Sequence, residues 1–240
     1  PTTYNYTLTT TGGACPGTAT GTITINPDGD LTQTSSIGTE SQVLCEGAAI
    51  LDITYTFSGG ATGATVTGLP AGVTFVVVNG NQVTISGTPS ADISVTTVYP
   101  FTVTTSGGSC ADASLSGTIT VDPEGAAQLT SGAGTDTQTI CEQTAIQDIT
   151  YLLVDGATGA TITGLPPGLN FNVNAGIVTI FGTPTVDVTT PTTYNYTLTT
   201  TGGACPGTAT GTITINPDDE LIQTSSIGTE SQVLCEGAAI

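Results

Sequence analysis

The sequence of 240 residues contains no lysine, arginine or histidine, and it also lacks methionine and tryptophan. Its 19 aspartate and glutamate side chains give a formal net charge of −19. Without a positive side chain the chain cannot neutralise nucleic-acid phosphates, so we expect no nucleic-acid partner. Without an imidazole or a lysine amine it cannot build a Ser-His-Asp site, a Cys-His site or a Schiff base.

Long apolar runs are missing too. No run approaches 18 residues, so we expect no membrane span in this stretch. Only 8% of the residues are charged and 37% are hydrophobic, so the negative charge is sparse enough for a core to form. Threonine makes up about a fifth of the chain and glycine contributes 32 residues, a composition that favours strands and turns.

The chain repeats itself. Residues 1–50 recur at 191–240 with three differences, at positions 29, 30 and 32 of the first copy. A weaker copy lies at half this offset: Gly-Leu-Pro at 68–70 returns at 164–166. The unit is therefore about 95 residues long, in an alternating series. We expect this chain to be a window on a longer array.

Within each unit, apolar residues alternate with polar ones, as they do in strands with one buried face. Leu51, Ile53, Tyr55 and Phe57 follow this period of two. Asn79-Gly80 separates two such runs and predicts a hairpin turn. About seven short strands per unit predict an all-β fold, built of tandem immunoglobulin-like β-sandwich domains in a linear array.

Prolines mark the predicted boundaries of the units, because proline cannot donate to a β-ladder. They stand at Pro27, Pro123 and Pro217. We predict the C-terminal part of a repeat at 1–27, complete repeats at 28–123 and 124–217, and the N-terminal part of the next repeat at 218–240.

Six cysteines are spaced regularly along the repeats, at Cys15, Cys45, Cys110, Cys141, Cys205 and Cys235. No two lie close in sequence, so disulfides are favoured over a metal site. We prefer pairing inside each repeat, because domains generally carry their own constraints. This joins Cys45 to Cys110 and Cys141 to Cys205, and leaves Cys15 and Cys235 to pair outside the window.

A second regular pairing stays open. Bonds Cys15–Cys45, Cys110–Cys141 and Cys205–Cys235 would cross the repeat boundaries and tie neighbouring repeats together. Counting strands does not decide between the two patterns, because Cys110 and Cys205 follow Gly-Gly turns while Cys45 and Cys141 precede the second strand of their repeats.

Carboxylates are the only candidates for catalysis, and paired carboxylates can cleave glycosides. Here they gather near the predicted boundaries and recur with the repeats, which favours a structural role. We therefore predict no enzymatic activity, no catalytic residue and no cofactor other than calcium, which prefers oxygen ligands at such alternating positions. The candidate calcium ligands are Asp28, Asp30, Asp122, Glu124, Asp218 and Asp219.

The repeat motifs carry a resemblance. Gly-Leu-Pro-Ala-Gly-Val at 68–73 and Gly-Leu-Pro-Pro-Gly-Leu at 164–169 are each followed by Gly-Thr-Pro, at 87–89 and 182–184. The fuller unit adds Gln-Thr-Ile-Cys-Glu at 138–142 and Gly-Gly-Ala-Cys at 202–205. Together they resemble the tandem immunoglobulin-like repeats of giant Bacteroidetes cell-surface adhesins, including the SprB-type gliding adhesins of flavobacteria.

This resemblance implies export by the type IX system and a long extracellular filament at the cell surface. It implies adhesion to a substratum and, in gliding cells, motility. The expected function is a structural stalk segment whose partners are neighbouring repeats of the same chain and surface polysaccharide or the substratum. The alternative is a carbohydrate-binding surface module that uses its Thr-rich faces or loops.

Overall fold

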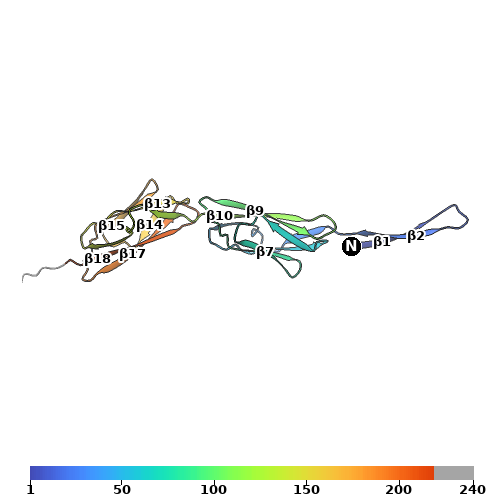
Figure 1. Ribbon diagram of the computed structural model, residues 1–240, viewed down its shortest axis with the longest axis horizontal. Coiled ribbons are helices and arrows are strands. Elements are labelled where there is room, and N and C mark those ends of the chain that lie inside the picture. Colours follow the sequence, from blue (N-terminus) through green and yellow to red (C-terminus); the bar gives the residue numbers. More distant parts are fainter. Residues whose placement is uncertain (219–240) are drawn as a thin grey trace, which may run out of the picture. The chain divides into compact units, whose positions relative to one another are not determined.

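The computed structural model describes residues 1–218, so Cys235 and the candidate ligand Asp219 lie outside the described residues. Every helix or strand assigned in this part of the chain is a β-strand (Figure 1). It contains no helix long and apolar enough to cross a membrane. The chain divides into two compact units, and the repeat boundaries named above stay a prediction. Unit 1 comprises Pro1–Gln128, Leu153–Thr161 and Thr199–Thr208; unit 2 comprises Leu129–Leu152, Ile162–Leu198 and, of the described residues, 209–218.

Unit 1 contains two four-stranded sheets. One has the order β3 (Gly29–Gln33), β5 (Ile53–Gly59), β8 (Gln82–Gly87) and β7 (Val73–Val78), and the other β4 (Ser41–Cys45), β10 (Ser114–Asp122), β9 (Thr97–Ser106) and β6 (Gly63–Thr67). Only β4 and β10 run parallel; the other pairs are antiparallel. Lettered in chain order, the strands form an ABED sheet facing a CFG sheet, with β4 added beside the last strand. This order is that of the immunoglobulin fold, which confirms the predicted fold class.

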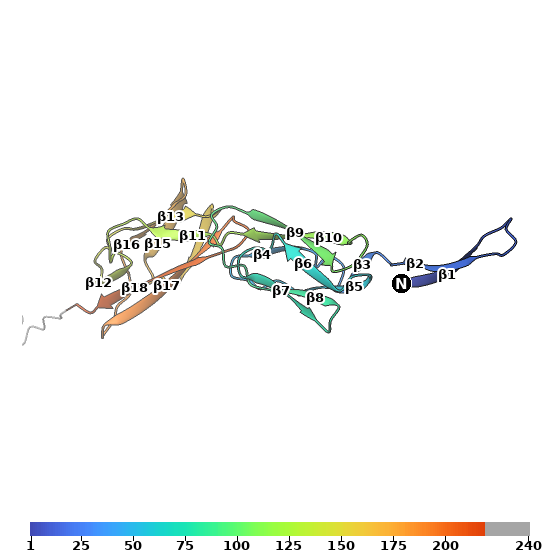
Figure 2. The same ribbon diagram turned by 45° about the vertical axis from the view of Figure 1, so that its right-hand side comes forward.

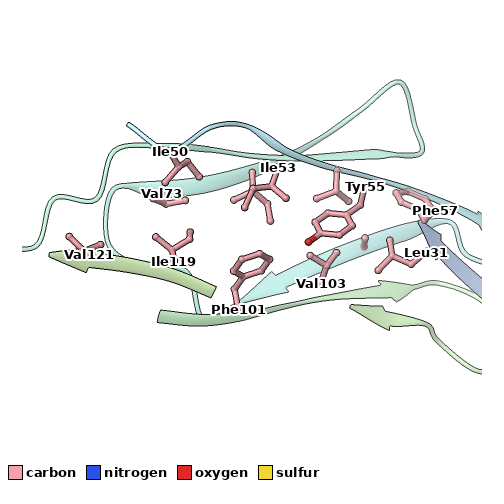
Figure 3. Packing of buried hydrophobic residues seen from close by; sticks show 13 residues of the cluster. Leu31, Ile50, Ile53, Tyr55, Phe57, Val73, Phe101, Val103, Ile119 and Val121 are labelled. Atoms are coloured by element: carbon pink, nitrogen blue, oxygen red, sulfur yellow. The ribbon is translucent and has the colours of Figure 1, made fainter. Parts of the chain in front are cut away.

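The core of these two sheets is built by the alternation seen in the sequence. Ile53, Tyr55 and Phe57 project from β5 toward Phe101 and Val103 on β9, and all five are at most 2% exposed (Figure 3). The threonines between them are only partly buried. Side chains on successive strand positions point to opposite faces, so a period of two in sequence becomes one apolar and one polar face.

The next repeat forms two further sheets with the same strand order. One is β11 (Ala126–Leu129), β13 (Ile149–Val154), β16 (Ile177–Gly182) and β15 (Leu169–Asn174); the other is β12 (Thr137–Cys141), β18 (Thr208–Asn216), β17 (Thr192–Thr201) and β14 (Gly159–Thr163). β12 again runs parallel to β18. The buried apolar residues recur at the corresponding positions, for example Ile149, Tyr151, Tyr196 and Leu198.

The predicted hairpin turn is present in both repeats. Asn79 and Gly80 both have positive φ angles, +53° and +77°, between β7 and β8. Ala175 and Gly176 have +49° and +78° between β15 and β16. Two successive positive φ angles fit a type I′ turn, whose twist matches that of the flanking strands.

The first hairpin shows that its apolar side chains are exposed where no second sheet packs on it. β1 (Thr2–Thr9) and β2 (Thr18–Ile25) form a two-stranded sheet that pairs with no other strand among the described residues (Figure 2). Tyr6 is 52% exposed and Leu8 is 65% exposed, whereas their sequence counterparts Tyr196 and Leu198 are at most 1% exposed. The two segments have identical sequences from 1–26 and 191–216. Burial here is therefore set by the facing sheet and not by the local sequence.

Buried tyrosines distinguish the two complete repeats. In the second, the hydroxyls of Tyr151 and Tyr196 bond each other at 2.8 Å. Burial, together with this bond, raises the pKa of Tyr196 far above its usual range. In the first, the counterpart of Tyr196 is Phe101, and the buried hydroxyl of Tyr55 has no hydrogen-bond partner. Desolvation raises the pKa of Tyr55 as well.

We predict that removing these two hydroxyls shifts stability in opposite directions. Tyr55→Phe removes an unpaired buried polar group and stabilises the first repeat by about 1 kcal/mol, whereas Tyr151→Phe orphans Tyr196 and costs about 1–3 kcal/mol. Urea unfolding followed by circular dichroism measures both, and each variant controls for the loss of a hydroxyl as such. Equal destabilisation by the two variants contradicts the prediction.

Candidate functional site

The disulfide between Cys45 and Cys205 is the site at which the structure departs most from the sequence-based expectation. The two Cα atoms lie 5.7 Å apart, and the cysteines are separated by 160 residues in sequence. This Cα separation is within the usual range for a disulfide. Both cysteines belong to unit 1. In the sequence, however, Cys45 lies in the predicted repeat 28–123 and Cys205 in the predicted repeat 124–217, so the bond joins one sequence repeat to the next.

Cys45 is placed by the parallel pairing of β4 with β10. In that register it stands opposite Asp122, the last residue of β10. The backbone N–H of the following residue, Glu46, donates to the carbonyl of Asp122 at 3.0 Å. Cys45 is thus held at the end of the sheet where β10 leaves it.

Cys205 lies in the turn between β17 and β18 and is 3% exposed. Its backbone forms an isolated parallel bridge with Glu124, and its carbonyl accepts the N–H of Gly125 at 2.9 Å. The hydroxyl of Thr200 donates to the carbonyl of Gly125 and accepts the N–H of Gly207 at 2.8 Å. These bonds fix the turn against the short segment that follows β10.

The preferred pairing inside each repeat is wrong in this structure, and strand length is the reason. Cys45 stands at the Asp122 end of β10, whereas Cys110 comes before Ser114, the first residue of that strand. The nine residues of this strand make eight steps of about 3.3 Å, so its two ends lie about 26 Å apart, far more than a disulfide can bridge. Cys141 and Cys205 are separated in the same way along β18.

The alternative pairing is contradicted as well. Because Cys45 and Cys205 bond each other, neither the Cys15–Cys45 bond nor the Cys205–Cys235 bond can form. Cys15, Cys110 and Cys141 are exposed free thiols, so the Cys110–Cys141 bond is absent too. The Sγ of Cys110 donates to the carbonyl of Asn26 at 3.4 Å.

Cys45 and Cys141 are each followed by a glutamate whose carboxylate accepts hydrogen bonds from the backbone of another segment. Glu46 accepts the N–H of Ile93 at 2.9 Å through one carboxylate oxygen and the N–H of Glu124 at 3.3 Å through the other. Glu142, its counterpart, accepts the N–H of Val188. The sequence motif Cys-Glu therefore marks an anchoring residue, a role that the sequence did not reveal.

A glutamine clamp recurs in the same way. The Gln42 amide donates to the carbonyls of Thr39 and Leu51 and accepts the N–H of Leu51 at 2.8 Å. Gln138 makes the same three bonds to Thr135 and Gln147. Each clamp ties the start of β4 or β12 to the segment that leads into the next strand. This explains why Gln precedes Cys by three residues in both repeats.

The candidate calcium ligands are dispersed. Asp28 accepts the N–H of Ala111, Asp30 accepts the Ser58 hydroxyl, and Asp122 accepts the Thr96 hydroxyl at 2.6 Å. Across residues 1–218, no group of three or more acidic or cysteine side chains is arranged to hold a metal ion. Asp218 is exposed. Calcium binding stays a prediction.

An open hollow of about 370 Å³ is lined by Glu46, Asp92 and Glu124 with residues of the loop after β8. Both carboxylate oxygens of Glu46 already accept backbone N–H groups there. Elsewhere, hydrogen bonding by the Gln33 amide lowers the pKa of Glu40. The carboxylates of Glu46 and Glu40 thus accept backbone N–H groups and hold the backbone in place.

We predict that Cys45→Ser and Cys205→Ser destabilise unit 1 equally and that the double variant is no worse than either. Each variant opens the same 160-residue loop, whose closure is worth at most about 5 kcal/mol in the chain-entropy model. Urea midpoints measure the effect. Cys110→Ser and Cys141→Ser are the matched controls and leave the midpoint unchanged, and additive losses in the double variant contradict the bond.

No protein-family model matches the chain, and no curated protein matches it. Among solved structures, the titin domains Z1Z2 in complex with telethonin are 12% identical with a TM-score of 0.35, over 83% of this chain and 100% of that one. The protocadherin GammaB4 extracellular domain is 13% identical with a TM-score of 0.41, over 90% of this chain and 38% of that one.

Human protocadherin-24 EC1-2 is 12% identical with a TM-score of 0.40, over 82% of this chain and 100% of that one. Likenesses at these levels carry no argument about function. The fold assignment rests on the strand order and register described above. The chain is therefore a tandem of immunoglobulin-like β-sandwich repeats, and the Cys45–Cys205 disulfide joins two of them.

Proposed function

We propose that this chain is a stalk segment of an extracellular cell-surface adhesin filament, with a structural role and no enzymatic one. The observation that carries the proposal is the Cys45–Cys205 disulfide, which adds a second covalent connection to the backbone link between consecutive repeats. Disulfides form and persist in oxidising compartments, which supports an extracellular location. The partners of each repeat are then its neighbours in the chain.

The polar faces support a scaffold role. Cross-strand threonine hydroxyls bond each other, as in Thr34 with Thr54 at 2.9 Å and Thr193 with Thr214 at 2.8 Å. Such pairs stabilise a sheet from its solvent side. With every charged side chain negative, the faces of two such filaments repel each other, which discourages pairing between exposed sheet edges.

We predict that the disulfide limits how far the chain extends under force. Pulled from residues 1 and 240, the oxidised chain extends about 550 Å less than the reduced chain, because the 160-residue loop stays closed at about 3.5 Å per residue. Single-molecule force spectroscopy with and without reductant measures the difference. Cys45→Ser reaches the full length without reductant and Cys110→Ser behaves like the parent. If the fully extended length is the same with and without reductant, the disulfide does not carry force and the support for a stalk is removed.

The finer proposal concerns what the filament touches. The motifs at 68–73 and 164–169 resemble those of giant Bacteroidetes adhesins, and this resemblance supports export by the type IX system, adhesion to a substratum or surface polysaccharide, and a part in gliding.

We predict saturable binding of the folded chain to at least one polysaccharide on a glycan array. Heat-unfolded chain is the control. No binding by the native chain contradicts an adhesive role for this segment and leaves the stalk role standing.

A further inference from the structure

The cysteines fall into two structural classes. The strand-end cysteines, Cys45 and Cys141, close β4 and β12 at corresponding register positions, opposite Asp122 and Asn216. In both, the next backbone N–H donates to the carbonyl of that opposite residue at 3.0 Å. Cys235 is their sequence counterpart and lies outside the described residues.

The turn cysteines are Cys15, Cys110 and Cys205, each in the turn of a long hairpin that follows a Gly-Gly pair. A threonine holds each turn in the same way. Thr10, Thr105 and Thr200 each donate their N–H across the turn at 2.9 Å and accept a returning N–H on the hydroxyl at 2.8 Å. The turns of Cys15 and Cys205 have the same length, and the turn of Cys110 is one residue longer on the side that follows the cysteine.

The Cys45–Cys205 disulfide joins a strand-end cysteine to the turn cysteine of the following repeat. We propose that this is a pairing rule for the whole array. Cys141 then bonds the turn cysteine of the repeat that follows its own, and Cys110 bonds the strand-end cysteine of the repeat that precedes its own. The rule predicts partners about 160 residues away in sequence, the separation of Cys45 and Cys205. No cysteine of this chain stands at that distance from Cys141 or Cys110 in the required direction.

The rule explains the free thiols without a further assumption. Cys110 and Cys141 are exposed, although their counterparts Cys205 and Cys45 are bonded. Cys141 matches Cys45 in strand register and in the hydrogen bond of the residue that follows it. Cys110 follows a Gly-Gly pair at the same spacing as Cys205, although its turn is one residue longer and its Sγ donates to the carbonyl of Asn26. The inference concerns the chemistry between repeats and holds whether or not the filament adheres.

Bond formation needs an electron acceptor, and we name oxidised glutathione. One cysteine thiolate attacks it, which forms a mixed disulfide and releases one glutathione thiolate. The second cysteine thiolate then attacks the protein sulfur of the mixed disulfide and releases the second glutathione. Two protein thiols lose two protons and two electrons in total, and one glutathione disulfide becomes two thiols.

The test extends the chain by its own period. Residues 1–190 are placed directly before a complete second copy, 1–240, so that the junction repeats the native sequence around Thr190-Pro191. The protein is folded at low concentration with oxidised and reduced glutathione, alkylated, and cut at acidic residues, since it contains no lysine or arginine. Because the two copies would otherwise yield identical peptides, positions near the cysteines differ between the copies by one methylene group, as in Val43→Leu, Val95→Leu, Thr18→Ser and Thr139→Ser. Mass spectrometry then assigns each bond to its copy.

The rule predicts three bonds in this extended chain. Cys45 of the first copy bonds Cys15 of the second, Cys141 of the first bonds Cys110 of the second, and Cys45 of the second bonds Cys205 of the second. The last bond is an internal control, because it is the one present in this structure. If it forms while Cys141 of the first copy is alkylated, the rule is overturned.

A matched variant separates pairing from chance reactivity. With Cys141→Ser in the first copy, Cys110 of the second copy becomes fully alkylated and the other two bonds remain. If Cys110 instead bonds another cysteine of the same chain, pairing is not set by the repeat frame and the rule is wrong. Absence of all three bonds overturns both the rule and the pairing from which it is inferred.

Discussion

One row of side chains buried between two sheets is the constraint on which the rest of the molecule depends. The hairpin at 2–25 and its identical counterpart at 192–215 have opposite burial, so the row exists only where a second sheet faces it. Sheets pack face to face about 10 Å apart, and a single sheet leaves its apolar face in water. Strand length also bears on the cysteines, because it separates the two ends of β10 and β18.

The two complete repeats show how much variation this constraint tolerates. Phe101 and Tyr196 fill the same place, and both rings lie over a glycine of the neighbouring strand, Gly117 or Gly211, where a Cβ would clash with the ring. A Cβ would also meet the backbone carbonyl of Glu40 or Asp136, so the ring and the neighbouring backbone together require glycine at these positions. Tyr196 has a hydroxyl that Phe101 lacks. This hydroxyl bonds that of Tyr151 in the second repeat, whereas Tyr55, the counterpart of Tyr151 in the first repeat, has no hydrogen-bond partner for its hydroxyl.

The sequence alone predicted the strands and turns but not the Cys45–Cys205 disulfide. Alternation predicted β5 with its buried Ile53, Tyr55 and Phe57, and Asn79-Gly80 predicted a turn, because both signals act over a few residues. The disulfide depends instead on which ends of β4 and β10 meet. The parallel register that sets Cys45 opposite Asp122 is a tertiary property with no local signal. The anchoring roles of Glu46 and Gln42 were equally hidden, because all their partners but Thr39 lie in segments 9 to 78 residues away.

The 160-residue loop also changes what a broken backbone means. A peptide bond cut anywhere between Cys45 and Cys205 leaves both fragments covalently attached, because the disulfide spans the cut. In an array where such loops begin once per repeat, their lengths exceed the 95-residue period and they overlap. Every cut in the interior then falls inside at least one loop. The proposed filament would then stay one molecule after a nick, and cuts by extracellular proteases would accumulate without severing it.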